Sequence, residues 1–421
     1  MTEQIEQRLA AAGLPPLPRL CWLEIDEGAL AHNLRLVRAL VGAQVELNAV
    51  VKADAYGHGI EAAARTFVRA GADRLCVASL DEALHLRSVG VQAAVLVLFA
   101  SPPQHVALAA RAGIELSLTD EATALATLSA WQKQAVAGPE LLVHVEVETG
   151  LARAGLRPEG VVEVCRRSLQ TPGVRLAGIW SHLASVDDQS FTDGQHREFE
   201  LAVSALRGAG LAVPARHLAA SGGLLSGRSP ALEGVRPGLV LYGLEPAGLP
   251  SGGTAAALSD GLRPAMALKC RPLRIVEVDT GTTVGYGGRW RAERPSRIAT
   301  LPVGYGDGWS RAYAPAAQAL VRGQRVPLVG TVAMDAVMAD VTDVSGVTPD
   351  DEFVLLGEQG DARISATELA RIRNTISWEV ITGMAQRLPR VYHSASVLRG
   401  VRTLGGEVRA RTAAGSGDSS R

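Results

Sequence analysis

The chain has 421 residues, of which 47% are hydrophobic and 20% charged, so it is too long for one ordinary compact domain and can bury a large core. Its 42 basic and 43 acidic side chains leave a formal net charge of -1, which offers no field to attract a phosphate backbone or an anionic leaflet. We therefore expect neither nucleic acid nor a membrane as a partner.

Two further patterns bear on location and on metal content. The first residues, MTEQIEQRLAAAG, are polar, and no apolar run reaches the roughly 18 residues of a spanning helix, so we expect a cytoplasmic protein. Four cysteines lie far apart without CxxC spacing: Cys21, Cys76, Cys165 and Cys270. This spacing predicts buried thiols rather than a disulfide framework or a zinc site, and we expect no metal.

From about residue 45 to 243, short β-branched runs alternate with helical stretches rich in Ala, Arg and Glu, which is the pattern of βα units on a parallel sheet. Most of the runs are almost continuously apolar, as expected of strands buried on both faces. The predicted strands are 45–51, 75–79, 94–99, 114–117, 142–147, 176–181, 215–219 and 235–241. Eight such strands predict an α/β fold with an N-terminal (β/α)8 TIM barrel.

Helices are expected between these strands, for example at 59–70, 79–87, 159–169 and 199–208. Residues suited to a helix start lie near the beginnings of the helical stretches: Ser79, Asp120 and Pro158.

The stretch 247–254 is rich in Gly and Pro and predicts a linker or a long loop. Beyond it, short apolar runs separated by turn signals predict a mainly antiparallel β domain, interrupted by a helix at 365–373. The runs are 274–278, 297–302, 324–328, 336–341 and 352–356. Residues 21–25 could pair into this domain. The expected division is an N-terminal segment 1–27, a barrel 28–255, a β domain 256–408 and a disordered tail 409–421.

Among the basic residues only Lys52, Lys133 and Lys269 are lysines. Lys52 ends the first barrel strand, and reactive groups of such barrels stand at the carboxyl ends of the strands. Loss of hydration there lowers a lysine pKa from about 10.4 and frees the amine as a nucleophile. From its position alone, Lys52 could equally well be a strand-end lysine that reaches into solvent and has no catalytic role.

Other polar residues follow later strands at the same predicted face. Arg153 follows strand five, His182 ends strand six, Ser221 follows strand seven and Arg236 lies within strand eight. If the strand count is right, most of these side chains face one mouth of the barrel.

The neighbours of Lys52 read VVKADAYGHG over residues 50–59. At this point the sequence resembles the alanine racemase family, whose signature is a strand that ends in VKA(N/D)AYGHG. The resemblance extends from about residue 21 to 392 through ETGLARAG (148–155), RPG (236–238), VGYG (284–287), VGYGDG (303–308), MD (334–335) and RVY (390–392). It implies pyridoxal phosphate as the cofactor, a homodimer with active sites shared between subunits, and racemisation of L- and D-alanine that supplies D-alanine for peptidoglycan precursors.

Racemisation removes a proton from one face of Cα and returns it on the other, so two bases must flank the substrate. The resemblance assigns the first base to Lys52, which would also bind the cofactor covalently. It assigns the second to Tyr286, which would reach the active site of the partner subunit. A free phenol titrates near pH 10, so nearby cationic or donor groups must favour the phenolate.

The resemblance also assigns the residues around the cofactor. Arg236 would donate to the pyridine nitrogen, keep it unprotonated and so restrain transamination, and His182 would link Arg236 to the tyrosine base. Arg153 would lie near the phenolic oxygen of the cofactor and the substrate carboxylate. The backbone N–H of Met334, contributed by the partner chain, would also meet that carboxylate. Tyr305 and Asp335 belong to the matching motifs and would support the site. The phosphate contacts would be Tyr56, Ser221, Gly238, Leu239 and Tyr392.

Three positions depart from the family pattern. Many members carry a carbamylated lysine where this chain has Glu146, whose own carboxylate is expected to fix Arg153 without carbon dioxide chemistry. Ala220 and Ala333 stand where an asparagine and a cysteine are frequent, and the smaller side chains could widen the substrate pocket. A racemase that also accepts serine or other amino acids therefore stays open.

Two other functions occur on the same barrel and are alternatives to racemisation. A fold-related pyridoxal-phosphate amino-acid decarboxylase shares the barrel and the β domain but lacks the VGYG tyrosine, so Tyr286 argues against it. A noncatalytic pyridoxal-phosphate carrier is a short single-domain chain, and the residues after 260 argue against that reading.

Overall fold

The computed structural model describes residues 4–134, 139–246, 248, 249 and 254–410. The chain divides into two compact units. The barrel unit consists of Leu30–Ala55 and Ile60–Arg263, and the β unit of Met1–Ala29, Tyr56–Gly59 and Pro264–Arg421. Within the described residues, no helix combines the length and the apolar character needed to cross a bilayer.

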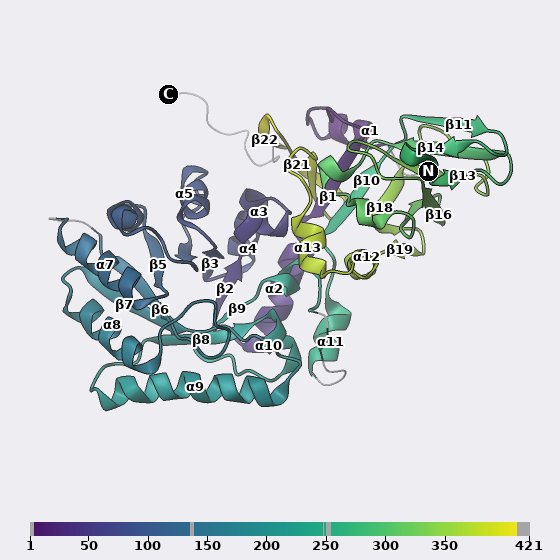
Figure 1. The fold of residues 1–421 in the computed structure, drawn as a ribbon. Coiled ribbons are helices and arrows are strands. Elements are labelled where there is room, and N and C mark those ends of the chain that lie inside the picture. The colour runs from purple at the N-terminus through teal and green to yellow at the C-terminus, as the bar shows by residue number, and fades with distance from the viewer. Residues whose placement is uncertain (1–3, 135–138, 247, 250–253, 411–421) are drawn as a thin grey trace, which may run out of the picture. The chain divides into compact units, whose positions relative to one another are not determined.

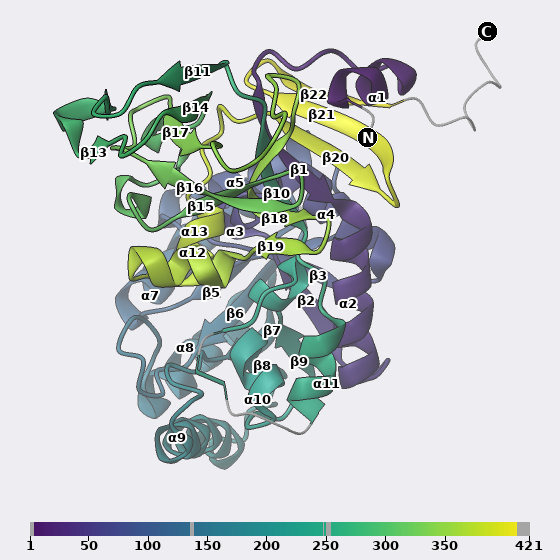
Figure 2. The same ribbon diagram turned by 90° about the vertical axis from the view of Figure 1, so that its right-hand side faces the viewer.

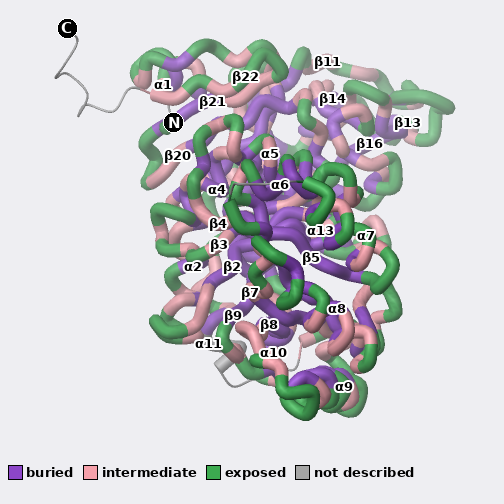
Figure 3. Tube along the Cα trace, turned by 90° about the vertical axis from the view of Figure 1, so that its left-hand side faces the viewer, coloured by how far each residue is buried: buried purple, intermediate pink, exposed green. Residues whose placement is uncertain are grey.

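The barrel unit contains a closed barrel of parallel strands in the order β2-β3-β4-β5-β6-β7-β8-β9, so the predicted (β/α)8 barrel is confirmed. Its strands are β2 (Glu46–Val50), β3 (Arg74–Val77), β4 (Ala94–Val97), β5 (Ile114–Leu118), β6 (Leu141–Glu146), β7 (Val174–Trp180), β8 (Ala215–Ala220) and β9 (Gly234–Arg236). Pairing of β2 with β9 closes the ring. The strands are largely buried, whereas the outer faces of the helices are exposed (Figure 3).

The last barrel strand is shorter than predicted. The sequence suggests a strand over 235–241, but β9 ends at Arg236 and Leu239–Tyr242 form a 3-10 helix, η2. Pro237 has no N–H with which to continue the ladder. The hydroxyl oxygen of Ser221 instead accepts hydrogen bonds from the backbone N–H groups of Gly238 (2.9 Å) and Val240 (3.3 Å).

Helices surround the barrel strands, with α7, α8 and α9 outside β5 to β8 in Figure 1. The helices are α2 (Glu27–Val41), α4 (Ile60–Ala70), α5 (Leu80–Ser88), α6 (Val106–Arg111), α7 (Glu121–Gln132), α8 (Pro158–Gln170), α9 (Gln189–Gly208), α10 (Ser221–Ser226) and α11 (Thr254–Gly261). Ser79 and Asp120 are the N-cap residues of α5 and α7, and Pro158 is the first residue of α8, as predicted.

Helix α9 begins ten residues before the predicted start at 199. Its first half buries the polar residues Thr192 and Gln195 rather than an apolar stripe, so hydrophobic periodicity gives no signal there. Gln195 hydrogen-bonds the backbone N of Ala184 (2.8 Å) and the carbonyl of His182 (3.1 Å). The helix start therefore fixes the loop that follows β7.

The β unit is built on a 12-stranded sheet in the order β11-β14-β17-β16-β15-β18-β10-β1-β20-β21-β22, with β19 paired to β18 (Figure 2). Its strands are β1 (Cys21–Asp26), β10 (Met266–Cys270), β11 (Arg274–Val278), β14 (Ser296–Leu301), β15 (Gln318–Val321), β16 (Gln324–Val329), β17 (Val337–Asp340), β18 (Phe353–Gln359), β19 (Ala362–Ile364), β20 (Arg390–Ser394), β21 (Val397–Thr403) and β22 (Gly406–Arg409). The strand predicted at 21–25 does pair here, antiparallel to β10 and parallel to β20. The predicted helix is α12 (Ala366–Arg373), capped by Ser365 and followed by α13 (Ser377–Thr382).

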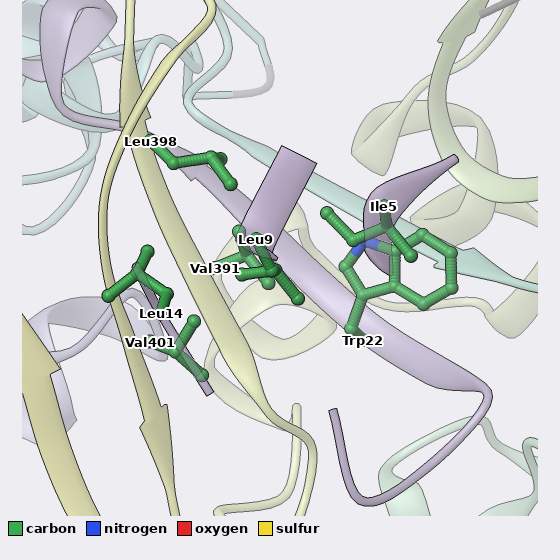
Figure 4. Packing of buried hydrophobic residues seen from close by; sticks show 7 residues of the cluster. All are labelled: Ile5, Leu9, Leu14, Trp22, Val391, Leu398 and Val401. Carbon is green, nitrogen blue, oxygen red and sulfur yellow. The ribbon is translucent and has the colours of Figure 1, made fainter. Parts of the chain in front are cut away.

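Helix α1 (Ile5–Ala11) is not predicted from the sequence, because it is short. Ile5, Leu9 and the following Leu14 pack against apolar side chains of β1, β20 and β21 (Figure 4). The partners are Trp22, Val391, Leu398 and Val401. Each fully buried leucine stabilises such a cluster by about 1.5–3 kcal/mol relative to an exposed one.

Two predicted irregular segments fall partly outside the described residues. Of the predicted linker 247–254, residues 247 and 250–253 lie outside them, and Thr254 opens α11. Of the predicted tail, residues 411–421 lie outside them, whereas Arg409 belongs to β22.

Candidate active site

Lys52 directly follows the first barrel strand, where Val51 donates a hydrogen bond to the carbonyl of Cys76 in β3. Its ammonium nitrogen lies 5.9 Å from the centre of the Phe99 ring. Burial lowers the pKa of Lys52, and the positive charges of Arg153 and Arg236 lower it further, against the opposing effect of Glu82 and Cys76. The predicted partly desolvated amine is therefore found.

The chain after Lys52 forms a left-handed turn, labelled α3 (Lys52–Tyr56). Ala53, Asp54, Ala55 and Tyr56 all have φ between 53° and 54°, a conformation that costs roughly 1–2 kcal/mol per residue. Two carboxylates help to hold it, because Glu82 accepts from the N–H of Ala53 (2.6 Å) and Asp54 from the N–H of Ile60 (2.8 Å). Strain of this kind is typical of functional sites.

Arg153 and Glu146 lie at the same end of the barrel. The Glu146 side chain is 3% exposed and the Arg153 side chain 39%, and Oε1 and Nη2 are 3.7 Å apart, an ion-pair distance longer than a hydrogen bond. Arg153 also lies 5.1 Å from the centre of the Phe99 ring. Burial raises the pKa of Glu146 to about 7, although Arg153 and Arg236 oppose the rise.

Arg236 is buried at the end of β9. Its Nη1 donates to Nδ1 (2.7 Å) and the carbonyl (2.5 Å) of His217, and its Nη2 donates to the carbonyls of Ser181 and Leu218. The guanidinium carbon lies 4.6 Å from the centre of the Trp180 ring. Burial lowers the pKa of Arg236 to about 10, so the group stays charged at neutral pH.

Arg236 retains one unused donor. Among the described residues, no acceptor is recorded for its Nε–H, while both terminal nitrogens are engaged. A charged donor in a buried site calls for an acceptor. The arrangement therefore suits a ligand that brings a lone pair to Nε.

His182 follows β7 and is half-buried. Burial lowers the pKa of its imidazole to about 3, and the positive charges of Arg236, Arg153 and Lys52 contribute. Within the described part of the chain, no hydrogen bond joins the His182 ring to Arg236. The histidine that bonds Arg236 is His217.

Helix α10, which directly follows β8, begins with Ser221 and two glycines. A Cβ on Gly222 would lie 2.9 Å from a methyl carbon of Val186, and a Cβ on Gly223 would lie 3.0 Å from the Cβ of Ser229. Only a bare backbone fits comfortably at these two positions. The Ser221 hydroxyl, which accepts from the N–H groups of Gly238 and Val240, joins the start of α10 to the start of η2.

Tyr56 and Tyr392 belong to the β unit. The segment Tyr56–Gly59 packs on β20, where a Cβ on Gly59 would lie 2.1 Å from the Tyr392 hydroxyl oxygen. The guanidinium of Arg390 donates to the carbonyl of Gly57 (3.0 Å). Gly59, with φ of 100°, is therefore a position where only glycine fits.

Tyr286 lies in a tight turn, η3 (Tyr286–Gly288), after the short strand β12 (Thr283–Val284), which pairs with β13 (Trp290–Arg291). Gly285 has φ of 78°, and a Cβ there would lie 2.8 Å from Cε of Met338. Thr331 donates to the Tyr286 carbonyl (3.0 Å). The backbone is thus fixed, while the tyrosine itself is 73% exposed.

Tyr305 and Met334 come from two adjoining loops of the β unit. The N–H groups of Tyr305 and Gly306 donate to the carbonyls of Ala333 (3.1 Å) and Met334 (2.9 Å). Asp335 pairs with Arg387 at 2.6 Å, and Arg387 also pairs with Asp307. The motifs VGYGDG and MD therefore meet in space.

Comparison with known proteins identifies the family behind these two groups of residues. The N-terminal domain of alanine racemases matches residues 25–246, and their C-terminal domain matches residues 265–392. The chain belongs to the alanine racemase family. The alanine racemase of Halothermothrix orenii is 36% identical over 378 residues, which cover 89% of this chain and 97% of that protein.

Solved structures of alanine racemases share the fold. The enzyme from Bacillus anthracis with bound L-Ala-P has a TM-score of 0.84 at 32% identity and covers 92% of this chain and 98% of its own. The alanine racemase from Bartonella henselae with covalently bound pyridoxal phosphate has a TM-score of 0.78 at 28% identity, with 89% and 100% covered. The resemblance drawn from the sequence motifs is thereby confirmed.

Sequence reasoning missed the buried polar residues beneath Arg236 in this alanine racemase fold. His217, His144 and Glu115 lie in β8, β6 and β5, and each is at most 5% exposed. Each interrupts an apolar strand with a polar side chain. That interruption is the signal that could have found them, since a buried titratable group requires a partner.

Proposed function

We propose that this chain interconverts L- and D-alanine with pyridoxal phosphate as the cofactor. Membership of the alanine racemase family supports the reaction. The observation that carries the proposal in this chain is Lys52, a half-buried amine at the end of a barrel strand whose pKa is lowered by its surroundings. A neutral amine is the form that reacts with an aldehyde.

The residues present fit pyridoxal phosphate. Lys52 supplies the amine for its aldehyde, and the unused Nε–H of Arg236 supplies a donor for its pyridine nitrogen. The Ser221 hydroxyl accepts from two backbone N–H groups and can still donate its own proton to a phosphate group. When bound, the cofactor would withdraw electrons from the substrate and acidify the hydrogen on Cα.

The proposed bases are Lys52 and Tyr286. Lys52 would take or return the proton on one face of Cα, and the phenol of Tyr286 would do so on the other face. We assign Tyr286 to the site of a second copy, so the functional species would be a homodimer. Its exposed phenol on a rigid turn suits that role.

The other residues would orient and stabilise. Arg236 would keep the pyridine nitrogen unprotonated, because a guanidinium with a pKa of about 10 holds its protons at neutral pH. Arg153, positioned by Glu146, and the backbone N–H of Met334 from the second copy would bind the substrate carboxylate. His182 would be a neutral neighbour of the site, and Tyr305 and Asp335 would support the loop of Met334. Tyr56, Ser221, Gly238, Leu239 and Tyr392 would surround the phosphate.

The wider role follows the same proposal. D-alanine made in the cytoplasm would supply peptidoglycan precursors. Ala220 and Ala333 leave more room than larger side chains, so turnover of serine is a second activity to be measured.

The test uses purified protein with L-alanine or L-serine in deuterated water, followed by chiral analysis and mass spectrometry. Racemisation predicts inversion with deuterium at Cα. Release of an amine and carbon dioxide would favour the decarboxylase, and no reaction would favour a carrier.

A second measurement tests Lys52 without relying on turnover. Borohydride reduction followed by peptide mass spectrometry should find the cofactor on Lys52. Lys52→Ala should abolish the label, whereas Lys133→Ala, at an exposed lysine, should leave it unchanged. Label at another lysine would contradict the assignment.

A further inference from the structure

We propose that Glu115, His144 and His217 form a directional hydrogen-bond chain through the barrel interior that positions Arg236 toward the cofactor ring. These three are positioning residues, since none of them is assigned a contact with substrate. The inference rests on the proposed function, because Arg236 matters only if a cofactor with a pyridine nitrogen binds.

The chain is continuous in the structure. Nη1 of Arg236 lies 2.7 Å from Nδ1 of His217, Nε2 of His217 lies 3.1 Å from Nδ1 of His144, and Nε2 of His144 lies 2.8 Å from Oε2 of Glu115. His144, His217 and Glu115 are 1%, 2% and 5% exposed. Water therefore does not compete for these bonds.

Only one arrangement of protons satisfies every contact. Arginine can only donate, so Nδ1 of His217 must accept and the proton of its ring must be on Nε2. That proton is donated to Nδ1 of His144, which places the His144 proton on Nε2, facing the Glu115 carboxylate. Both rings are then neutral, and a second proton on either ring would set two donors against each other.

The electrostatic surroundings agree with neutral rings. Burial lowers the pKa of His217 well below its usual value, and Arg236 and His144 lower it further. Burial also lowers the pKa of His144, although Glu115 opposes that shift. For Glu115 itself, burial would raise the pKa, but the hydrogen bond from His144 and the charge of Arg74 outweigh it.

The far end of the chain is anchored by a second arginine. Nε of Arg74 lies 2.9 Å from Oε2 of Glu115, and its Nη1 donates to Glu46 (2.6 Å) and Asn48 (2.6 Å). Arg236 and Arg74 therefore stand at opposite ends, with Glu115 and Glu46 as the balancing carboxylates. A buried carboxylate held in this way cannot rotate freely and fixes the direction of the chain.

A glycine makes room for the contact between the two histidines. A Cβ on Gly178 would lie 2.2 Å from Nδ1 of His144 and 3.1 Å from Nε2 of His217. Trp180, two residues further along β7, stacks on His217 with the rings 9° from parallel and also covers Arg236. Residues of β7 thus pack against both histidines and Arg236.

The consequence for Arg236 is a fixed guanidinium plane. His217 engages Nη1 through its ring and its carbonyl, and the carbonyls of Ser181 and Leu218 engage Nη2. Backbone carbonyls accept donors over a broad range of angles, whereas a ring nitrogen accepts in its plane. The His217 ring therefore sets the direction in which Nε–H points.

The first test reads the protons directly. In 15N NMR spectra of the holoenzyme with labelled histidine, assigned by substitution among the nine histidines, we expect His144 and His217 as neutral Nε2–H tautomers that do not titrate near neutral pH. A Nδ1–H tautomer or a charged ring at either position would overturn the proposal. This measurement does not depend on activity, and the tautomers are read from the unaltered protein, since the substituted proteins serve only to assign the signals.

The second test interrupts the chain with one methyl group. Gly178→Ala should lower kcat for alanine by about tenfold or more, the loss expected for a misdirected charge-assisted hydrogen bond, with the KM for alanine little changed. The cofactor absorption band should shift, and transamination turnovers per racemisation should rise. Gly208→Ala, where an added Cβ meets nothing within 4 Å, is the matched control.

The outcomes separate the two proposals. Absence of cofactor binding and racemisation in the unaltered protein would refute the proposed function, whatever the tautomers are. An active enzyme in which Gly178→Ala folds but leaves kcat, the absorption band and the transamination ratio unchanged would refute the positioning chain alone. If Gly178→Ala does not fold, the tautomers of the unaltered enzyme decide.

Discussion

Glu146 and Arg153 face each other at the carboxyl end of the barrel, with 3.7 Å between Oε1 and Nη2. The Glu146 side chain is almost fully buried, whereas the Arg153 side chain is partly exposed. We propose that the carboxyl group of Glu146 stands in for a modified lysine beside Arg153, although its pKa of about 7 leaves it only partly ionised at neutral pH.

Glu146→Gln tests that anchor. Removing the charge while keeping the shape should lower kcat/KM for alanine by about five- to tenfold, since a charge-assisted contact at the substrate carboxylate is lost. Steady-state kinetics measure it, with Glu163→Gln, on the outer helix α8 beside Arg167, as the control. Unchanged kinetics in Glu146→Gln would remove Glu146 from the site.

The raised pKa of Glu146 also predicts how stability depends on pH. Because its folded pKa of about 7 exceeds the ordinary value of 4.5, the folded chain holds the extra proton between these values. The free energy of unfolding from this group therefore falls as the pH rises from 4.5 to 7, by about 3 kcal/mol. In urea unfolding of the cofactor-free protein, the free energy of unfolding of the wild type should fall by that amount between pH 4.5 and 7 relative to Glu146→Gln. Parallel plots of unfolding free energy against pH for the two proteins would contradict the raised pKa.

The α1 cluster should affect stability and not catalysis. Leu9 is completely buried against the cluster of Trp22 and Val391, so Leu9→Ala should lower the free energy of unfolding by about 2–4 kcal/mol. Leu404→Ala, at a leucine that is 77% exposed, should change it by less than about 0.5 kcal/mol. Thermal unfolding and kcat of both variants test this prediction. A loss of kcat in Leu9→Ala at a temperature where the variant is folded would contradict it and assign α1 a role in the site.

Periodicity in the sequence predicts the barrel well, because strands buried on both faces are continuous apolar runs such as 94–99, which contains β4 (Ala94–Val97). Periodicity does not predict the strand ends that are set by a particular side chain. Strand β9, the last of the barrel, ends at Arg236 because Pro237 cannot extend the ladder and the Ser221 hydroxyl accepts from the N–H groups of Gly238 and Val240. Pairings of that kind join positions distant in sequence, which a local pattern does not contain.

The candidate site divides in the same way. Lys52 and Tyr286 follow from motifs, since each lies inside a long match to one family. His217 does not, because its importance comes from a bond to Arg236 that only the fold creates. Arg236 bonds His217 rather than His182 because the fold turns the His217 ring toward the guanidinium. The sequence does not show which of the two rings faces Arg236.

In the proposed enzyme, Lys52 of one subunit and Tyr286 of another serve the same substrate, and subunit mixing tests this directly. Lys52→Ala and Tyr286→Phe should each be nearly inactive alone. Unfolded together and refolded, they should regain about a quarter of wild-type activity, because half of randomly paired dimers contain one site with both residues intact. Mixtures as inactive as the separate variants, despite proven exchange of subunits, would contradict a shared site.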